Sequence, residues 1–187
     1  MNTLKQILYN FLIYIRILFI LPGIDWRNEK LLMDLNRWSE ILSISGSRVD
    51  VLAALMNDYP EFRNLYMYRC KNGLYKRWVK LFYRPMNTLY IMCDEIGGGL
   101  FIQHGFATYI AAKSIGKNCW INQQVTIGYT GHGGPPIIGD NVTITCGAKV
   151  IGPVTLGDNA IIGANAVVVK DVEPNAVMVG IPAKRIK

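Results

Sequence analysis

Histidine and cysteine are scarce in this chain of 187 residues. The two histidines, His104 and His132, are too few for a zinc site that uses three histidine ligands. The four cysteines include no C-x-x-C pair, which excludes the usual zinc-ribbon and disulfide frameworks. We therefore expect no metal site, and unpaired cysteines favour a reducing, cytoplasmic environment.

Acidic residues are also few, with 13 Asp and Glu against 20 Lys and Arg, so the net charge is +7. Such an excess predicts an anionic partner, such as a phosphorylated cofactor, nucleic acid or a membrane surface. The sequence holds no recognisable nucleic-acid-binding module, so nucleic acid is not expected. Between Arg63 and Arg84 the basic residues alternate with aromatics, and no acidic residue intervenes. This run is either a solvated face or a contact for phosphate or lipid headgroups.

No hydrophobic run is long enough to cross a membrane. The apolar stretch from Ile7 to Leu21 contains Arg16 and is shorter than the roughly 20 residues that a span requires. Pro22 and Gly23 follow it in place of a small-residue cleavage site, so a signal peptide is not expected. Residues 3-21 therefore form a helix that either packs against protein or lies peripherally on the inner face of the membrane. The polar residues of this segment fall on one narrow helical stripe: Asn2, Gln6, Asn10 and Arg16.

Residues 1-85 have the apolar spacing of α-helices. Ser47 and Asp50 have the spacing of a capping box, in which each side chain satisfies a free backbone donor. Pro60 suits the first turn of a helix, and Gly73 is expected to interrupt the helical structure after it. The helices are predicted over residues 28–43, 48–57, 60–71 and 74–83.

From Ile96 onward the sequence repeats every six residues. Each leading aliphatic residue is followed four positions later by a small or β-branched residue. This periodicity is typical of a parallel β-helix, in which three short strands form one triangular coil, and we predict one over residues 86-187. The leading residues are Ile115, Ile121, Ile127, Ile138, Ile144, Val150, Leu156, Ile162 and Val168. The third position after a leader is often a residue that tolerates the positive φ of a tight turn: Asn118, Asn141, Gly147, Asn159 and Asn165.

The repeat places His104 at a turn, two residues after the leader Ile102. One extra residue is inserted in the repeat near Tyr109. One coil later Gln123 has the same offset from its leader, so we expect it to stack beside the imidazole. Aliphatic residues fill the predicted core, so His104 is not needed for packing and is a candidate for catalysis.

The repeat is interrupted by a loop rich in glycine and proline over residues 128-137. Its glycines make the backbone permissive, and its two prolines fix the return to the prism. The loop leaves the prism one element away from the His104 turn. His132 lies on this loop and is a second candidate catalytic residue.

Several motifs resemble the left-handed β-helix (hexapeptide-repeat) acyltransferases, and within them the serine O-acetyltransferase branch. They are I-G-G-G-L-F-I-Q-H-G (96–105), I-G-K-N-C-W-I-N-Q-Q-V-T-I-G (115–128) and V-G-I-P-A-K (179–184). The same branch includes enzymes that acetylate capsular and other surface sugars. The resemblance covers about Tyr90 to Ile186. It implies a mainly β protein, a left-handed parallel β-helix preceded by an α-helical N-terminal region.

The resemblance further implies an acetyl-CoA-dependent O-acetyltransferase that works as a homotrimer, with each active site in a groove between two prisms. Whether trimers pair further through their helical regions stays open. His104 matches the general base of the family, which takes the hydroxyl proton of the acceptor as the oxygen attacks the thioester carbonyl. This role suits imidazole, which titrates near neutral pH, where a hydroxyl is hardly ionised.

The same resemblance places acetyl-CoA along the corners of the coils. Small corner residues let the pantetheine arm lie flat, although the same residues also suit plain turns: Gly147, Ala148, Gly163 and Ala164. Lys170, Lys184 and Arg185 offer cations for the nucleotide phosphates.

Three features depart from the pattern of the serine enzymes. Leu89 stands where the family has the acid that orients the histidine, and the nearest acids are Asp94 and Glu95. Gln103 replaces the acid before the histidine, and Gly-Pro replaces the arginine and histidine that bind the serine carboxylate. We therefore favour a sugar or polysaccharide hydroxyl over L-serine as the acceptor. The missing partners also leave open a catalytically silent scaffold or membrane-docking β-helix.

Overall fold

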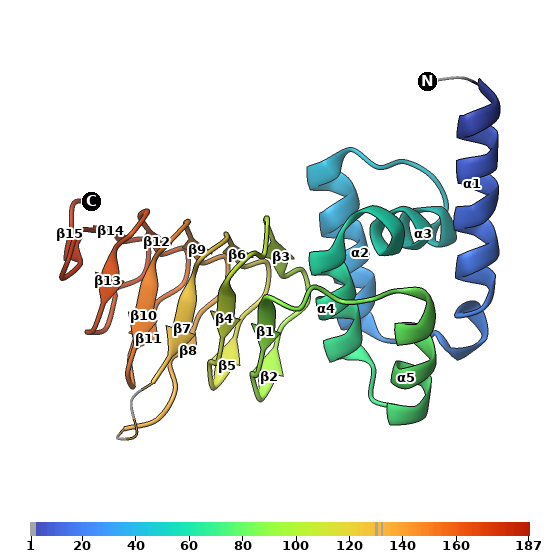
Figure 1. The fold of residues 1–187 in the computed structure, drawn as a ribbon. Helices are drawn as coiled ribbons and strands as arrows, with labels where there is room; N and C mark the ends of the chain where they lie inside the picture. Colours follow the sequence, from blue (N-terminus) through green and yellow to red (C-terminus); the bar gives the residue numbers. More distant parts are fainter. Residues whose placement is uncertain (1–2, 130, 132) are drawn as a thin grey trace. The chain divides into compact units, whose positions relative to one another are not determined.

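The computed structural model describes residues 3–129, 131 and 133–187, without the side chains of residues 3–10. The chain forms two compact units, Met1–Pro85 and Met86–Lys187. The first unit is helical and the second is built of short strands (Figure 1).

The helical unit follows the predicted order of elements, with one local difference. It contains α1 (Thr3–Leu18), η1 (Leu21–Gly23), α2 (Glu29–Leu42), α3 (Arg48–Asp58), α4 (Pro60–Arg69) and α5 (Gly73–Phe82) (Figure 1). The capping box at the start of α3 is confirmed, because Ser47 and Asp50 each accept a hydrogen bond from the other's backbone N–H. Gly73 does not interrupt the helical structure as expected but is the first residue of α5. The side chain of Asn72 accepts from the N–H groups of Leu74 and Tyr75, which starts the helix one residue earlier.

The orientation of α1 differs from the one that its sequence suggests. Arg16 was expected on a polar stripe, but its guanidinium points into the helical unit. It donates to Asn57 Oδ1 at 3.0 Å and to the carbonyl oxygen of Phe82, and lies 4.5 Å from the centroid of the Tyr83 ring. Asn2 lies outside the described residues, as do the side chains of Gln6 and Asn10. Among the described helices, none has the length and apolar character to cross a bilayer.

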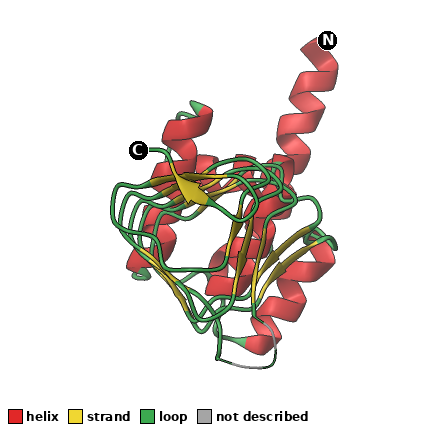
Figure 2. Ribbon diagram, turned by 90° about the vertical axis from the view of Figure 1, so that its left-hand side faces the viewer, coloured by secondary structure: helices red, strands yellow, loops and turns green. Residues whose placement is uncertain are grey.

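The second unit is a parallel β-helix whose coils contribute short strands to three sheets (Figure 2). The first sheet holds β1 (Leu89–Ile91), β4 (Thr108–Ile110), β7 (Thr126–Gly128), β10 (Lys149–Ile151) and β13 (Val167–Val168). The second sheet holds β2 (Glu95–Ile96), β5 (Ser114–Ile115), β8 (Ile137–Ile138) and β11 (Thr155–Leu156). The third sheet holds β3 (Phe101–Ile102), β6 (Trp120–Ile121), β9 (Thr143–Ile144), β12 (Ile161–Ile162), β14 (Val177–Val179) and β15 (Lys184–Arg185).

The six-residue pattern is confirmed in the core and at the corners of this unit. The leading residues Ile115 to Val168 are all buried, with at most 2% of their surface exposed. Strands of successive coils pair in parallel, for example Ile121 with both Ile102 and Ile144. The predicted turn residues all have positive φ, between 55° and 73°. Packing of the leaders and the conformational tolerance of the turn residues therefore repeat together with each coil.

The irregularity in the repeat lies in the His104 turn, which ends directly before Tyr109, where the extra residue was expected. Ile102 pairs with Ile121, and Tyr109 pairs with Thr126, so both ends of this turn are in register with the next coil. The turn between them is two residues longer than its neighbour. One residue fewer separates Ile110 from the next leader, so this coil is longer than a regular one by the single extra residue that the sequence predicted.

Candidate functional site

His104 stands on the corner between the third and first sheets, directly after β3. Its backbone is left-handed, with φ 59°, and its side chain is exposed. The turn is held through Phe106, whose N–H donates to the His104 carbonyl oxygen. The Phe106 carbonyl oxygen accepts from the Gln124 N–H at 2.8 Å and from Thr108 Oγ1 at 3.1 Å. These bonds fix the backbone under the imidazole and project the ring away from the core.

Gln123 lies on the same corner, one coil further along. The neighbouring Gln124 N–H bonds to Phe106, so this coil supports the underside of the His104 turn. The Oε1 atom of Gln123 is buried and has no hydrogen-bond partner within the described part of the chain. A buried acceptor without a partner is costly. Gln123 therefore offers an acceptor for an imidazole N–H or for a bound molecule.

Gln103, considered above only as a departure from the family pattern, is fixed by two neighbours. Its Oε1 accepts from Trp120 Nε1 at 3.2 Å and from Asn122 Nδ2 at 2.8 Å. The Trp120 ring packs edge-on against Phe101, with ring centroids 4.7 Å apart. The repeat could have predicted this contact. Gln103 and Asn122 each directly follow a leading residue, so they occupy equivalent positions in successive coils and must stack. Two bonds to the oxygen leave the amide NH₂ of Gln103 as its free polar group.

The acids nearest to His104 in sequence belong to another edge of the prism. Asp94 and Glu95 stand at the corner between the first and second sheets, where β2 begins. Leu89, at the position of the orienting acid, is buried in β1. Within its own chain His104 therefore has Gln123, and not a carboxylate, on its own edge.

The small residues that were proposed to contact the acetyl donor lie on the same edge of the prism as His104. They follow β9 and β12, at the same corner between the third and first sheets, in successive coils: Gly147, Ala148, Gly163 and Ala164. Gly147 has φ 73°, and a Cβ there would clash with Asn165 Oδ1, so the turn alone requires glycine. Ala148 is fully buried and its N–H donates to the Thr145 carbonyl oxygen, so the structure does not bring it to the surface where a ligand could contact it. Ala164 is exposed on the edge.

The predicted cations divide between two edges. Lys184 and Arg185 are exposed on β15, which pairs antiparallel with β14. The Ala183 N–H donates to the Val167 carbonyl oxygen at 2.8 Å, so the tail crosses the end of the His104 edge. Lys170 follows β13 at the corner between the first and second sheets and is not brought to this edge.

Lys149 is a cation on the His104 edge that sequence reasoning missed. Its Nζ donates to the carbonyl oxygens of Gln124 at 2.6 Å and Gly147 at 3.0 Å. The position of Lys149 in the repeat could have identified it, because the residue begins β10 directly after a corner and its side chain points out of the prism.

The loop between β7 and β8 leaves the corner between the first and second sheets. The first sheet separates this corner from the His104 corner, in agreement with the expected offset of one element. His132, the second candidate catalytic residue, lies outside the described residues. In the described ranges, no group of three or more His, Cys, Asp or Glu residues could hold a metal ion.

Comparison with known proteins links the chain to one family. The family model described as bacterial transferase hexapeptide (six repeats) matches residues 135–170. A serine acetyltransferase from Helicobacter pylori is 37% identical over 143 residues, which cover 68% of this chain and 82% of the relative. A serine acetyltransferase from Synechococcus elongatus is 34% identical over 140 residues, which cover 57% of that relative. A serine acetyltransferase from Mycobacterium tuberculosis is 44% identical over 95 residues, which cover 42% of that relative. The chain thus spans about half the length of these two relatives.

Solved structures agree with this relationship. The serine acetyltransferase of Neisseria gonorrhoeae, solved in complex with serine, has a TM-score of 0.61 at 25% identity. The match covers 85% of this chain and 68% of that chain. The serine acetyltransferase of Brucella abortus, solved in complex with Coenzyme A, shares the fold with a TM-score of 0.62 at 24% identity. It covers 89% of this chain and 70% of that chain. The repeat, the coil geometry and the identity to the Helicobacter protein together show that this chain belongs to the serine acetyltransferase family of hexapeptide-repeat transferases.

Proposed function

We propose that the chain is an acetyl-CoA-dependent O-acetyltransferase with His104 as its general base. The observation that carries this proposal is the exposed imidazole on a fixed turn, on the same prism edge as the small residues proposed to contact the acetyl donor. The relatives support it through their name, serine acetyltransferase.

The chemistry follows from this arrangement. His104 accepts the hydroxyl proton while the oxygen forms a bond to the thioester carbonyl carbon. The carbon–sulfur bond then breaks and the sulfur leaves readily as a thiolate, because the pKa of its thiol is near that of cysteine, about 8.5. The thiolate takes up the proton held by the imidazolium. Backbone N–H groups at the glycine-rich corners suit the oxyanion that forms between these steps. The protein positions the two substrates and supplies one base, and no metal is needed for this chemistry.

L-serine is the acceptor that the comparisons favour. The preference for a sugar hydroxyl drawn from the sequence is not supported by the names of the relatives, which all specify serine. One of the similar structures was solved with serine bound. L-serine therefore comes first among the acceptors to be tested.

A sugar hydroxyl is the second candidate, and Gln103 is the observation that favours it. The free polar group of this side chain is an NH₂ donor, because its oxygen already accepts two hydrogen bonds. A neutral donor does not attract the ammonium group of an amino acid, whereas it can bond to a sugar oxygen. Gly134 and Pro135 also offer no cation for a carboxylate.

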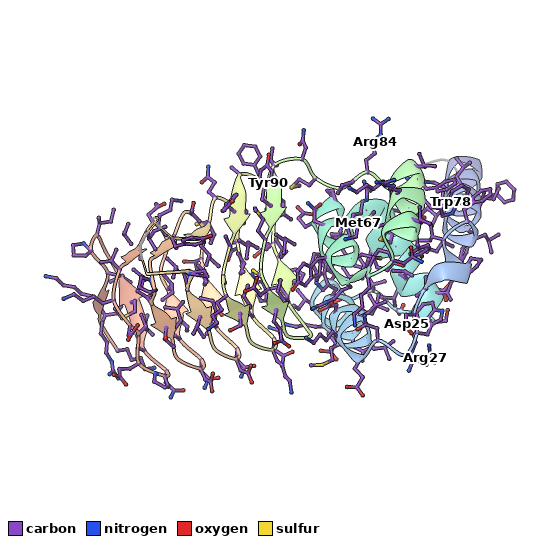
Figure 3. The ribbon with its side chains drawn as sticks, turned by 90° about the horizontal axis from the view of Figure 1, so that it is seen from below. Asp25, Arg27, Met67, Trp78, Arg84 and Tyr90 are labelled. Carbon is purple, nitrogen blue, oxygen red and sulfur yellow. The ribbon has the colours of Figure 1, made fainter. Side chains whose placement is uncertain are left out.

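We also propose that the active unit is a cytoplasmic homotrimer. The outer side of the first sheet exposes Tyr90 and Tyr109, whose ring centroids lie 5.8 Å apart, and Tyr90 points away from the β-helix (Figure 3). Exposed aromatic clusters of this kind are typical of contact surfaces. The four cysteines form no disulfide, which suits a reducing compartment.

The test measures thiol release from acetyl-CoA with L-serine, amino sugars and oligosaccharides as acceptors. His104→Asn removes the base but tolerates the left-handed backbone, so the fold is retained. We expect this variant to lose about 10²–10⁴-fold in rate with each acceptor. Full activity in His104→Asn would overturn the assignment. If titration calorimetry shows no heat with acetyl-CoA, the chain is a silent scaffold.

A further inference from the structure

The helix α5 exposes a stripe of large apolar side chains that the described side chains of the helical unit leave uncovered. Leu74, Trp78 and Leu81 are spaced by four and three residues and so share one side of the helix. Leu74 and Leu81 are 77% and 73% exposed. The opposite side of α5 carries Val79, which is fully buried. The side of α5 that carries Val79 therefore packs into the unit, and the stripe is held to it through Trp78.

The end of α1 continues this stripe. Trp78 Nε1 donates to the Phe19 carbonyl oxygen at 2.8 Å. The Phe19 ring stacks on Phe82 with centroids 4.8 Å apart, and Trp78 packs edge-on against the same ring at 5.2 Å. The exposed side chains at the end of α1 and on α5 therefore form one surface, the α1–α5 face: Leu18, Phe19, Leu74, Trp78 and Leu81.

Cations flank the α1–α5 face, and acids are missing from both segments that build it. Residues 1–24 and 62–93 contain no Asp or Glu. In the basic run, Arg63 and Arg69 are used internally, on the Met56 carbonyl oxygen and on Asp34. The remaining cations are exposed or half-buried, and Arg84 extends away from the helices (Figure 3): Lys71, Lys76, Arg77, Lys80 and Arg84.

We propose that the α1–α5 face docks on the surface of a bilayer containing anionic phospholipid. Tryptophan and leucine side chains enter the boundary between headgroups and acyl chains, while lysine and arginine reach the phosphates. The charge of the face selects this partner. Asp50 of α3 is an acid beside α1, where it accepts a hydrogen bond from Tyr14 at 2.6 Å, and the cations outnumber it, so a second copy of the chain would still set cation against cation. The proposal concerns attachment and does not depend on the acetyl-transfer activity.

The test is co-sedimentation of the full chain with phosphatidylcholine vesicles, with or without phosphatidylserine. Binding is expected only to the anionic vesicles and is expected to weaken as salt rises. The pair Arg77→Gln and Lys80→Gln should weaken binding about 25-fold, since each cation near an anionic surface contributes about fivefold. Leu74→Glu with Leu81→Glu should abolish it. The control pair Lys113→Gln and Lys117→Gln loses the same charge on the β-helix, where both side chains are exposed, and should bind as the unchanged chain does.

Three results would overturn the proposal. They are equal binding to neutral vesicles, unchanged binding by both α5 variant pairs, and absence of binding to either vesicle. If the chain fails to bind vesicles and Leu74→Glu with Leu81→Glu lowers its mass in light scattering, the face instead joins copies of the chain. Circular dichroism and thiol release measured on each variant show whether the fold and the site are retained.

Discussion

The turn that carries His104 is longer than the corners around it, and this extra length separates the imidazole from the core. Its backbone is tied to the next coil through Phe106 and Gln124. Left-handed φ values at His104 and Ala107, 59° and 51°, let the chain bulge outward and return to register at Thr108. A histidine in a regular corner would have less backbone available to extend from the edge.

Among single residues, Gln123 is the one that we expect to orient the His104 ring in place of a carboxylate. We expect the Gln123 oxygen to accept from the imidazole once substrates are bound, so Gln123→Ala should lower kcat about fivefold, the equivalent of about 1 kcal/mol for one hydrogen bond. Gln123→Glu places an anion there, which favours the imidazolium. It should therefore move the acidic limb of the pH–rate profile to higher pH. If neither variant changes the rate or the profile, Gln123 does not position the base.

At the scale of elements, α2 and α4 are joined by an ion pair buried inside the helical unit. Arg69 Nε and Nη2 donate to the two Asp34 carboxylate oxygens at 2.7 and 3.1 Å. The Asp34 side chain is fully buried and that of Arg69 is 4% exposed. The pair fixes the register of the two helices, since its geometry is bidentate.

Removal of one partner should be far more damaging than removal of both. Arg69→Met leaves Asp34 charged and buried, so the free energy of unfolding should fall by about 3–5 kcal/mol. The double variant Asp34→Leu with Arg69→Met should regain most of this loss. Urea unfolding followed by the helical circular dichroism signal gives both values. Equal destabilisation of the single and double variants would contradict this account.

At the scale of the whole molecule, one chain does not bring its loop and its His104 to the same edge. The His104 corner and the loop corner lie on either side of the first sheet. In a trimer of parallel prisms, the loop of one chain is better placed to approach the His104 edge of a neighbour. We therefore expect each active site to use two chains.

Mixed trimers test this arrangement. A His104→Asn chain and a chain lacking residues 131–135 should each be inactive alone. Co-expressed in equal amounts, they should regain about one quarter of the unchanged activity, because a quarter of the sites then combine an intact histidine with an intact loop. A mixture no more active than either variant alone would show that His104 and the loop act within one chain.

Much of the β-helix could be predicted from sequence because its core is local and periodic. Each leader, such as Ile121, occupies the inward position of one strand, and each Asn at a corner meets the same backbone requirement. The small residues after Ile144 and Ile162 could be assigned to corners by counting. The capping box at Ser47 was equally visible, because it depends on residues three positions apart.

The rest required tertiary structure. Counting detected an irregular coil but not that its extra residues lie under His104, since register is set by pairing of Ile102 and Tyr109 with the next coil. The inward direction of Arg16 depends on how α1 is rotated against its neighbours, which supply acceptors at Asn57 and Phe82. Helical spacing shows that a stripe exists, but only packing against other helices decides which stripe remains exposed. The sequence alone therefore determined the repeat and the candidate base, whereas contacts between distant segments decided the edge of the site and the surface left free.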